Sequence, residues 1–275
     1  MADIEVEVTD GVMVATLNRP EKMNSLSSEL TAGLLAAIER ASAGDDIRVM
    51  VLTGAGRAFC AGAEVSADRA PAGGANSNGN GTGTPPARSR HDRMNFQAGS
   101  AEVAGAFARC DVPIIGGING VAAGGGFGIA LCCDVRIFAE SARIGSIFIK
   151  RGIAADYGAA YWLPRIVGVS KAFELFYDGN LLDSASALDL GLANRVVPDD
   201  EFSDELMAYA RRIAAGPPMG YTGIRRLIQD SVNSIDREVF LDREWGMQTA
   251  LLRSGDAGEG FQSFLERREP QFTGS

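Results

Sequence analysis

The sequence predicts an α/β fold that ends in a wholly helical region. Short apolar or alternating runs, typical of strands, come between helical patterns in the first part of the chain, in a β-β-α-β order that recurs. Gly-rich segments follow two of the expected strands, and only helical periodicity is found beyond residue 158. The 275 residues fit one large α/β domain or two small ones and can bury a sizeable core.

The individual elements follow from periodicity and from turn residues. Apolar runs and alternation predict strands at residues 4–8, 12–17, 48–53, 113–118 and 135–139. Asp10-Gly11 between the first two strands predicts a hairpin turn. Helical spacing predicts helices from Ser27 to Gly44, from near Ala101, and up to Cys133, and then at residues 159–167, 171–177, 184–190, 201–215, 220–230, 237–253 and 258–268.

Charge and hydropathy exclude several classes of partner. Lys and Arg number 26 against 35 Asp and Glu, so the formal charge is −9, which opposes binding to nucleic acid or to an anionic membrane surface. No apolar run reaches about 18 residues, and the first residues resemble no signal peptide. We therefore expect a cytoplasmic protein that is not anchored to a membrane.

Histidine and cysteine usage limits the chemistry further. His91 is the single histidine, so a metal site built on several imidazoles is excluded, and a Ser-His-Asp triad would have to use this residue. Cys60, Cys110, Cys132 and Cys133 lack the spacing of metal ligands. We expect reduced core thiols and no metal site.

Residues 71–88 contain no large apolar side chain that could offset the entropy cost of ordering. They predict a mobile loop. A linker between two domains is the weaker interpretation, because the segment before it is too short to hold a core of its own.

Two Gly- and Ala-rich runs each follow an expected strand. Residues 119–131 open a helix, where bare N–H groups and the helix dipole favour an anionic oxygen. The Gly-Lys-Ser/Thr of a phosphate-binding loop is missing, so glycines that serve only tight packing remain an alternative. Residues 57–64 lie in a similar turn, and one N–H from each run could form an oxyanion hole.

Four runs carry a resemblance to a known family: R-P-E-K-M-N-S-L at 19–26, R-A-F-C-A-G-A-E at 57–64, N-G-V-A-A-G-G-G-F-G at 119–128 and F-L-E-R-R-E-P-Q-F at 264–272. In this order they resemble the enoyl-CoA hydratase/isomerase family, or crotonases. The resemblance implies a spiral of ββα repeats over residues 1–200, with 69–93 as a mobile insert. It also implies a helical C-terminal trimerisation region at 201–275, a homotrimer or dimer of trimers, and acyl-CoA thioester substrates with no further cofactor.

The resemblance also assigns site residues. The oxyanion donors would be the backbone N–H groups of Ala63 and Gly125. Further contacts to the CoA thioester would come from Lys22, Met23, Ala61, Phe148 and, in a neighbouring subunit, Arg267. Arg267 stands where the family often has Lys, and Arg keeps the charge and adds a fork for phosphate. Glu64 and Asp134 fit structural roles better than catalytic ones.

Departures from the family pattern decide the predicted reaction. Hydratases of the family carry two Glu residues, and Gly128 and Phe148 stand at those places here, so hydration by two Glu is not expected. Asp156, in G-I-A-A-D-Y-G at 152–158, matches the Asp turn of isomerase-like members. Its apolar neighbours would raise its pKa, which suits a general base. The alternative is that Asp156 only caps the following helix.

The sequence therefore predicts an acyl-CoA isomerase that shifts a double bond through a thioester dienolate, with Asp156 as the base. Three alternatives stay open. One is an enoyl-CoA hydratase with a non-standard site. Another is an aryl-CoA dehalogenase in which Asp156 is the nucleophile and His91 activates water, although those enzymes carry Trp where Phe148 stands. The third is a CoA-thioester binder without catalysis. The length, ring or branching of the acyl group is not predicted.

Overall fold

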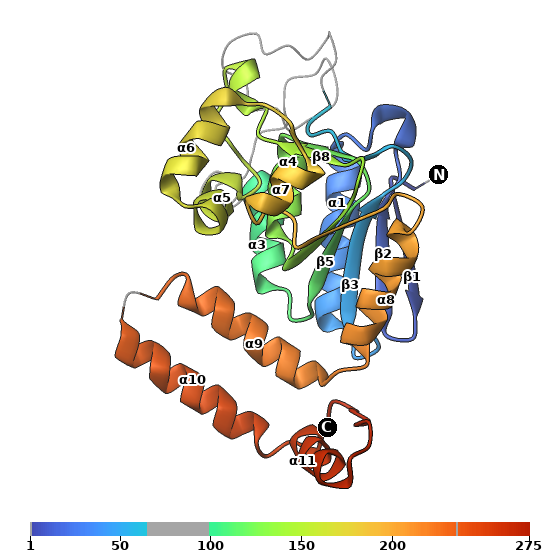
Figure 1. The fold of residues 1–275 in the computed structure, drawn as a ribbon, viewed down its shortest axis with the longest axis vertical. Helices are drawn as coiled ribbons and strands as arrows, with labels where there is room; N and C mark the ends of the chain where they lie inside the picture. The colour runs from blue at the N-terminus through green and yellow to red at the C-terminus, as the bar shows by residue number, and fades with distance from the viewer. Residues whose placement is uncertain (1, 65–98, 235) are drawn as a thin grey trace, which may run out of the picture.

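A computed structural model describes residues 2–64, 99–234 and 236–275 (Figure 1). The loop predicted at 71–88, the insert predicted at 69–93 and His91 lie outside these residues, so the hypotheses that involve them stay predictions.

The larger sheet has six strands in the order β1-β2-β3-β5-β7-β10. Their bounds are β1 Ile4–Thr9, β2 Val12–Leu17, β3 Val49–Gly54, β5 Ile114–Ile118, β7 Val135–Ala139 and β10 Arg195–Val197. β1 and β2 form the predicted antiparallel hairpin, and Asp10 and Gly11 both have positive φ, as a tight hairpin turn requires. The remaining neighbours pair in parallel.

A second, smaller sheet has the order β4-β6-β8-β9. Its strands are β4 Ala58–Cys60, β6 Val121–Ala123, β8 Arg143–Gly145 and β9 Leu182–Asp183. Along the chain, β3 is followed by β4, β5 by β6 and β7 by β8, so each pass places one strand in each sheet. This alternation between the sheets generates a spiral, and the sequence patterns did not predict the smaller sheet.

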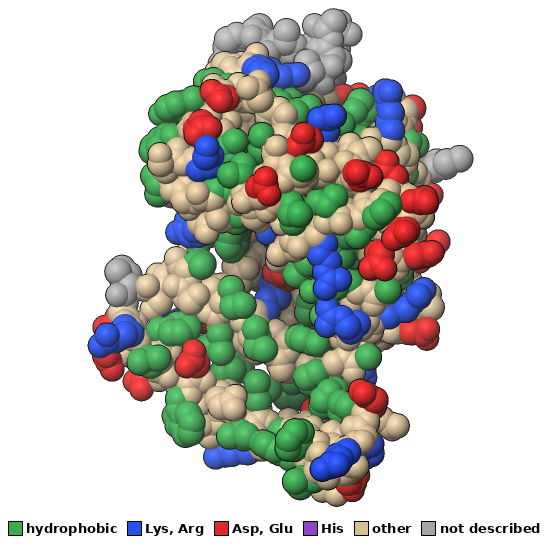
Figure 2. Space-filling model, in the orientation of Figure 1, with side chains coloured by type: hydrophobic (Ala, Val, Ile, Leu, Met, Phe, Trp, Pro, Cys, Tyr) green, Lys and Arg blue, Asp and Glu red, His purple; other side chains and the backbone are tan. Residues whose placement is uncertain are grey.

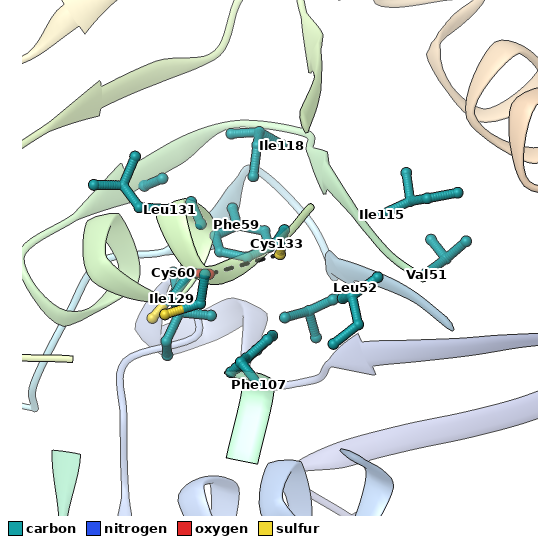
Figure 3. Packing of buried hydrophobic residues seen from close by; sticks show 14 of the residues in the cluster. Val51, Leu52, Phe59, Cys60, Phe107, Ile115, Ile118, Ile129, Leu131 and Cys133 are labelled. Atoms are coloured by element: carbon teal, nitrogen blue, oxygen red, sulfur yellow. Dashed lines mark hydrogen bonds between the residues drawn. The ribbon is translucent and has the colours of Figure 1, made fainter. Parts of the chain in front are cut away.

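Helices α1 (Ser28–Ala43), α3 (Ser100–Arg109) and α4 (Gly125–Cys132) belong to this spiral. α1 begins as expected, because the Ser27 hydroxyl oxygen accepts from the Leu30 N–H at 3.0 Å, and it ends at Gly44. All eight residues of α4 are buried. The core gathers side chains from both sheets and from α3 and α4 (Figure 3). The four cysteines are buried and free, as predicted, and burial raises the pKa of the Cys133 thiol.

The rest of the chain is mainly helical, as predicted, but β9 and β10 also lie beyond residue 158, and sequence periodicity did not predict them because they have only two and three residues. Its helices are α5 Ala159–Val167, α6 Val169–Asp178, α7 Ser184–Asp189, α8 Phe202–Ala214, α9 Pro218–Ser231, α10 Arg237–Leu251 and α11 Gly255–Glu266, and the short 3₁₀ turns η1 Pro20–Lys22 and η3 Phe148–Arg151 lie earlier. α8 lies against the larger sheet, whereas α9, α10 and α11 project from the other end of the molecule than α5 and α6 (Figure 1). Within the described residues, no helix combines the length and apolar character needed to cross a bilayer.

Candidate active site

The turn after β4 is hydrogen-bonded to the segment that carries the 19–26 motif. The Ala61 N–H donates to the Met23 carbonyl at 3.0 Å, and Met23 has a left-handed backbone with φ of 53°. Lys22 precedes Met23 at the end of η1 and reaches the same turn through Glu64. Three residues predicted to contact the CoA thioester, Lys22, Met23 and Ala61, are therefore neighbours in the structure.

Glu64 fixes the turn through two cations. Its carboxylate accepts from Lys22 Nζ at 2.5 Å and from an Arg19 guanidinium nitrogen at 3.0 Å. These hydrogen bonds, from Lys22 first and then from Arg19, lower the pKa of Glu64 below its usual value. The carboxylate thus stays ionised and holds the turn, which is the structural role expected for it.

Ala63 forms an isolated parallel bridge with Leu26. The two bridging hydrogen bonds, Leu26 N to Gly62 O at 2.8 Å and Glu64 N to Leu26 O at 3.4 Å, use the residues on either side of Ala63. The N–H and the carbonyl of Ala63 itself therefore point away from Leu26. Among the described residues, its N–H has no hydrogen-bond acceptor.

The N-terminus of α4 lies directly against this turn. A Cβ on Gly62, whose φ is +92°, would lie 2.8 Å from the Ala123 carbonyl oxygen and 3.3 Å from the Gly125 nitrogen, so only glycine permits the approach. Gly125 opens α4, and the first N–H groups of a helix lack intrahelical acceptors. The structure thus brings the neighbourhood of Ala63 and that of Gly125 together at the positive end of a helix dipole.

Asp156 lies in a tight turn between η3 and α5. Tyr157 and Gly158 both have left-handed backbones, with φ of 50° and 75°, and the Ala159 N–H donates to the Asp156 carbonyl at 3.0 Å. The N-cap of α5 is Gly158, and no side chain caps this helix. The interpretation of Asp156 as a helix cap is therefore excluded.

The Asp156 carboxyl is exposed on one side and crowded by protein on the other. Desolvation by burial raises its pKa to about 6, and a hydrogen bond from its own N–H lowers it in part. This confirms the direction expected from its neighbours. A carboxyl with a pKa near 6 is a stronger base than an ordinary one and is still mostly ionised at pH 7.

Tyr157 links the Asp156 turn to α4. A Cβ on Gly125 would lie 3.0 Å from two atoms of the Tyr157 ring, so the ring lies against the first residue of the helix. Burial raises the pKa of the Tyr157 hydroxyl to about 12, which keeps it neutral at physiological pH. The ring therefore places the Asp156 turn beside the first turn of α4.

The two positions at which the resemblance places the family's Glu residues carry no titratable group. Gly128 is buried within α4, and Phe148, at 5% exposure, belongs to the hydrophobic core at the start of η3. The Phe148 carbonyl accepts from the Ile153 N–H at 3.4 Å, so the backbone of η3 is hydrogen-bonded to the segment that precedes the Asp156 turn. A contact between Phe148 and substrate stays a prediction.

Two further sequence hypotheses have different outcomes. Asp134 accepts from the Ile114 N–H at 2.7 Å and from Arg225 Nε at 2.8 Å, which confirms its structural role. Arg267 follows α11 with a φ of 56°, and α11 lies at the end of the molecule opposite α5 (Figure 1). The protomer does not bring Arg267 to Asp156, so its predicted role in a neighbouring subunit stays a prediction.

One contact at the site was missed by sequence reasoning. The Cys132 thiol donates to the Tyr157 carbonyl at 3.5 Å, although the sequence suggested only a core thiol. No local sequence pattern predicts this hydrogen bond, because the two residues are 25 positions apart and meet only where the Asp156 turn packs on α4.

A carboxylate of raised pKa in a turn that packs on a helix N-terminus, where backbone N–H groups lack acceptors, suits an enzyme that polarises a carbonyl and moves a proton next to it. The chain belongs to the enoyl-CoA hydratase/isomerase family, because the family model of that description matches residues 7–275.

Individual relatives support the same assignment. The chain is 36% identical over 268 residues to 1,2-epoxyphenylacetyl-CoA isomerase of Escherichia coli K12, covering 97% of each chain. It is 32% identical to (E)-benzylidenesuccinyl-CoA hydratase of Thauera aromatica, covering 99% of each. The crystal structure of an enoyl-CoA hydratase from Bacillus anthracis superimposes with a TM-score of 0.86 at 29% identity, covering 99% of this chain and all of that one. The predicted crotonase fold is therefore confirmed.

Proposed function

We propose that this family member is an acyl-CoA isomerase that shifts a double bond through a thioester dienolate. One observation carries the proposal: Asp156, with a pKa raised to about 6, is joined to the start of α4 by Tyr157, whereas positions 128 and 148 hold Gly and Phe. A single base suffices to take and return one proton. Addition of water by two Glu residues would need groups that these two positions lack.

The reaction uses a few groups of the chain. Asp156 removes a proton from the carbon next to the thioester carbonyl, and the electron pair moves onto the carbonyl oxygen. The N–H groups of Ala63 and Gly125 stabilise the resulting dienolate, and loss of one such donor costs about 2.7–4 kcal/mol of barrier. The protonated Asp156 then returns its proton at the gamma carbon, so substrate and product are isomers.

We assign binding of the CoA moiety to the residues that lie beside Glu64. Lys22 and Met23, with the backbone of Ala61, form one side of the site. Arg267 would act from a neighbouring subunit within a homotrimer or a dimer of trimers. Exposed apolar side chains on α10 and α11 support such association, since they include Trp245 at 69% and Phe264 at 82% exposure.

The test compares two substrates of the full-length protein, an unbranched 3-enoyl-CoA and the corresponding 2-enoyl-CoA. We expect isomerisation of the first, with an acid limb near pH 6 because the base must be ionised. Asp156→Asn should lower kcat by about 10²–10⁴-fold, the range for loss of a general base. Asp178→Asn is the matched control, since Asp178 ends α6 and is exposed.

Two results would contradict the proposal. One is near wild-type turnover of the 3-enoyl-CoA by Asp156→Asn. The other is efficient conversion of the 2-enoyl-CoA to its 3-hydroxy product, which would favour hydration, the activity named for the relative from Thauera aromatica.

A further inference from the structure

The Asp156 turn is packed against α4 with no room for a side chain between them. A Cβ built on Gly128 would lie 2.7 Å from Tyr157 Cβ, 2.8 Å from the Tyr157 carbonyl oxygen and 2.9 Å from the Asp156 carbonyl oxygen. Two of these three atoms are backbone, which cannot swing aside as the end of a flexible side chain can. Any residue other than glycine at 128 must therefore displace the turn or the helix.

Two more residues on the same side of α4 contact this turn. Gly125, three positions earlier, lies against the Tyr157 ring, and Cys132, four positions later, donates its thiol proton to the Tyr157 carbonyl at 3.5 Å. Residues three and four apart lie on one face of a helix. The contacts on Gly125, Gly128 and Cys132 thus span two turns along one face, and Gly128 lies between the other two.

We propose that Gly128 is a positioning residue for the base, because its lack of a side chain lets the Asp156 turn lie on α4 and so sets the distance from Asp156 to the thioester. This inference rests on the proposed function. It also gives Gly128 a role beyond the absence of a catalytic Glu. The Asp156 turn occupies the space that a side chain at position 128 would fill.

The turn must move if the space is filled. All residues of α4 are buried in the core, whereas the turn keeps exposed residues on its outer side. Nonbonded carbon atoms rest about 3.5–4.0 Å apart, so a methyl group at 128 pushes Tyr157 away by about 1 Å. A misplacement of about 1 Å can cost about 10²-fold in rate.

The experiment uses Gly128→Ala in the full-length protein, with unbranched 3-hexenoyl-CoA as the probe. It measures kcat, KM and the exchange of the alpha protons with deuterated water. We expect kcat and exchange to fall by about 10²-fold while KM changes little. Gly258→Ala is the matched control, because Gly258 lies in α11 and a Cβ there would meet no atom within 4 Å.

A pH profile separates positioning from simple loss of folded protein. Among the described residues, the titratable side chain next to Asp156 is that of Tyr157, whose pKa is raised to about 12, mainly by desolvation, so it stays neutral throughout. A turn lifted off α4 would hydrate Asp156, so the acid limb should move from about pH 6 towards lower pH. Loss of folded protein would lower the rate without moving the limb.

Cys132→Ala provides a second test if Gly128→Ala does not fold, since it removes a contact and adds no atoms. We expect a severalfold fall in kcat and the same direction of movement of the acid limb. Wild-type kcat and acid limb in Gly128→Ala, or in Cys132→Ala where the first variant does not fold, would overturn the positioning role while leaving the proposed function intact. An active Asp156→Asn would overturn both.

Discussion

The spiral core and the three helices α9–α11 use apolar residues in opposite ways. In the core, α4 buries every residue, and large side chains such as Phe138 are fully enclosed. In the C-terminal region, α10 buries none, and Phe264 of α11 is 82% exposed. Apolar side chains also gather over α9 and α10 in the space-filling view (Figure 2). The core is complete within one protomer, whereas the C-terminal helices hold apolar surface that a second surface would have to cover.

Several polar contacts join the two regions, and one of them is made by a buried cation. Arg225 of α9, at 6% exposure, pairs with Asp134 at 2.8 Å and donates to the carbonyls of Phe107, Ala108 and Cys110 at the end of α3. A cavity of about 350 Å³ lies beside it, between α9 and the starts of β5 and β7. Contact between the two regions is thus polar and local rather than a continuation of the core.

The largest effect is expected in the core. Phe138→Ala should lower the free energy of unfolding by about 3–5 kcal/mol, because a fully buried ring leaves a cavity. Urea denaturation measures it, and the loss should not depend on protein concentration. A loss below about 1 kcal/mol would mean that the core relaxes around the site and is less rigid than its packing indicates.

Removal of the joining cation should have the next largest effect. Arg225→Ala leaves Asp134 without its cation and three carbonyls without a donor, so we expect a loss of about 3 kcal/mol. The neighbouring Arg226→Ala is the control, since its pair with Asp111 is exposed and such pairs contribute about 0–1 kcal/mol. Equal losses in the two variants would show that burial of Arg225 does not set its contribution.

A Phe→Ala substitution in the C-terminal region should act differently from Phe138→Ala in the core. Phe264→Ala removes an exposed ring, so the stability of the isolated protomer should change by no more than about 0.5 kcal/mol. Association should weaken instead, and Tm should become more dependent on protein concentration. Sedimentation velocity measures the association, and unchanged association would remove Phe264 from the proposed interface.

The smallest effect concerns the base itself. Because the pKa of Asp156 is raised from an ordinary value of about 4 to about 6, the folded state binds more protons between these pH values, and stability falls as pH rises through this window. Asp156→Asn should therefore raise Tm at pH 7 by roughly 2 °C, a value reduced for the exposure of the carboxyl. The gain should vanish below about pH 4, and a gain that persists there would have another cause.

Much of the fold could be predicted from the sequence, and the missing part has a physical reason. The β1–β2 hairpin and α1 carry local signals in Asp10-Gly11, Ser27 and Gly44, and the structure confirms them. The strands of the smaller sheet have only two or three residues each. So few residues show no alternation, and these strands exist because the spiral places them beside one another.

The candidate site also has a part that the sequence predicts and a part that it does not. The choice of Asp156 came from a motif and from resemblance, and its raised pKa followed from its neighbours. The contact of the Asp156 turn with Gly128 and Cys132 could not be predicted, because it depends on where α4 meets a turn some 25 positions later. Local sequence carries no information about such a distance.

The position of Arg225 also has a consequence for the order of folding. Its bonds reach back 91 residues to Asp134 and 118 to Phe107, so they close long loops and can form only after the strands between them have paired. During synthesis, α9 leaves the ribosome after the whole spiral. Until it docks, the carbonyls at the end of α3 must be solvated by water. We therefore expect the spiral to assemble first, and the hydrogen bonds from α9 to the end of α3 to form after it.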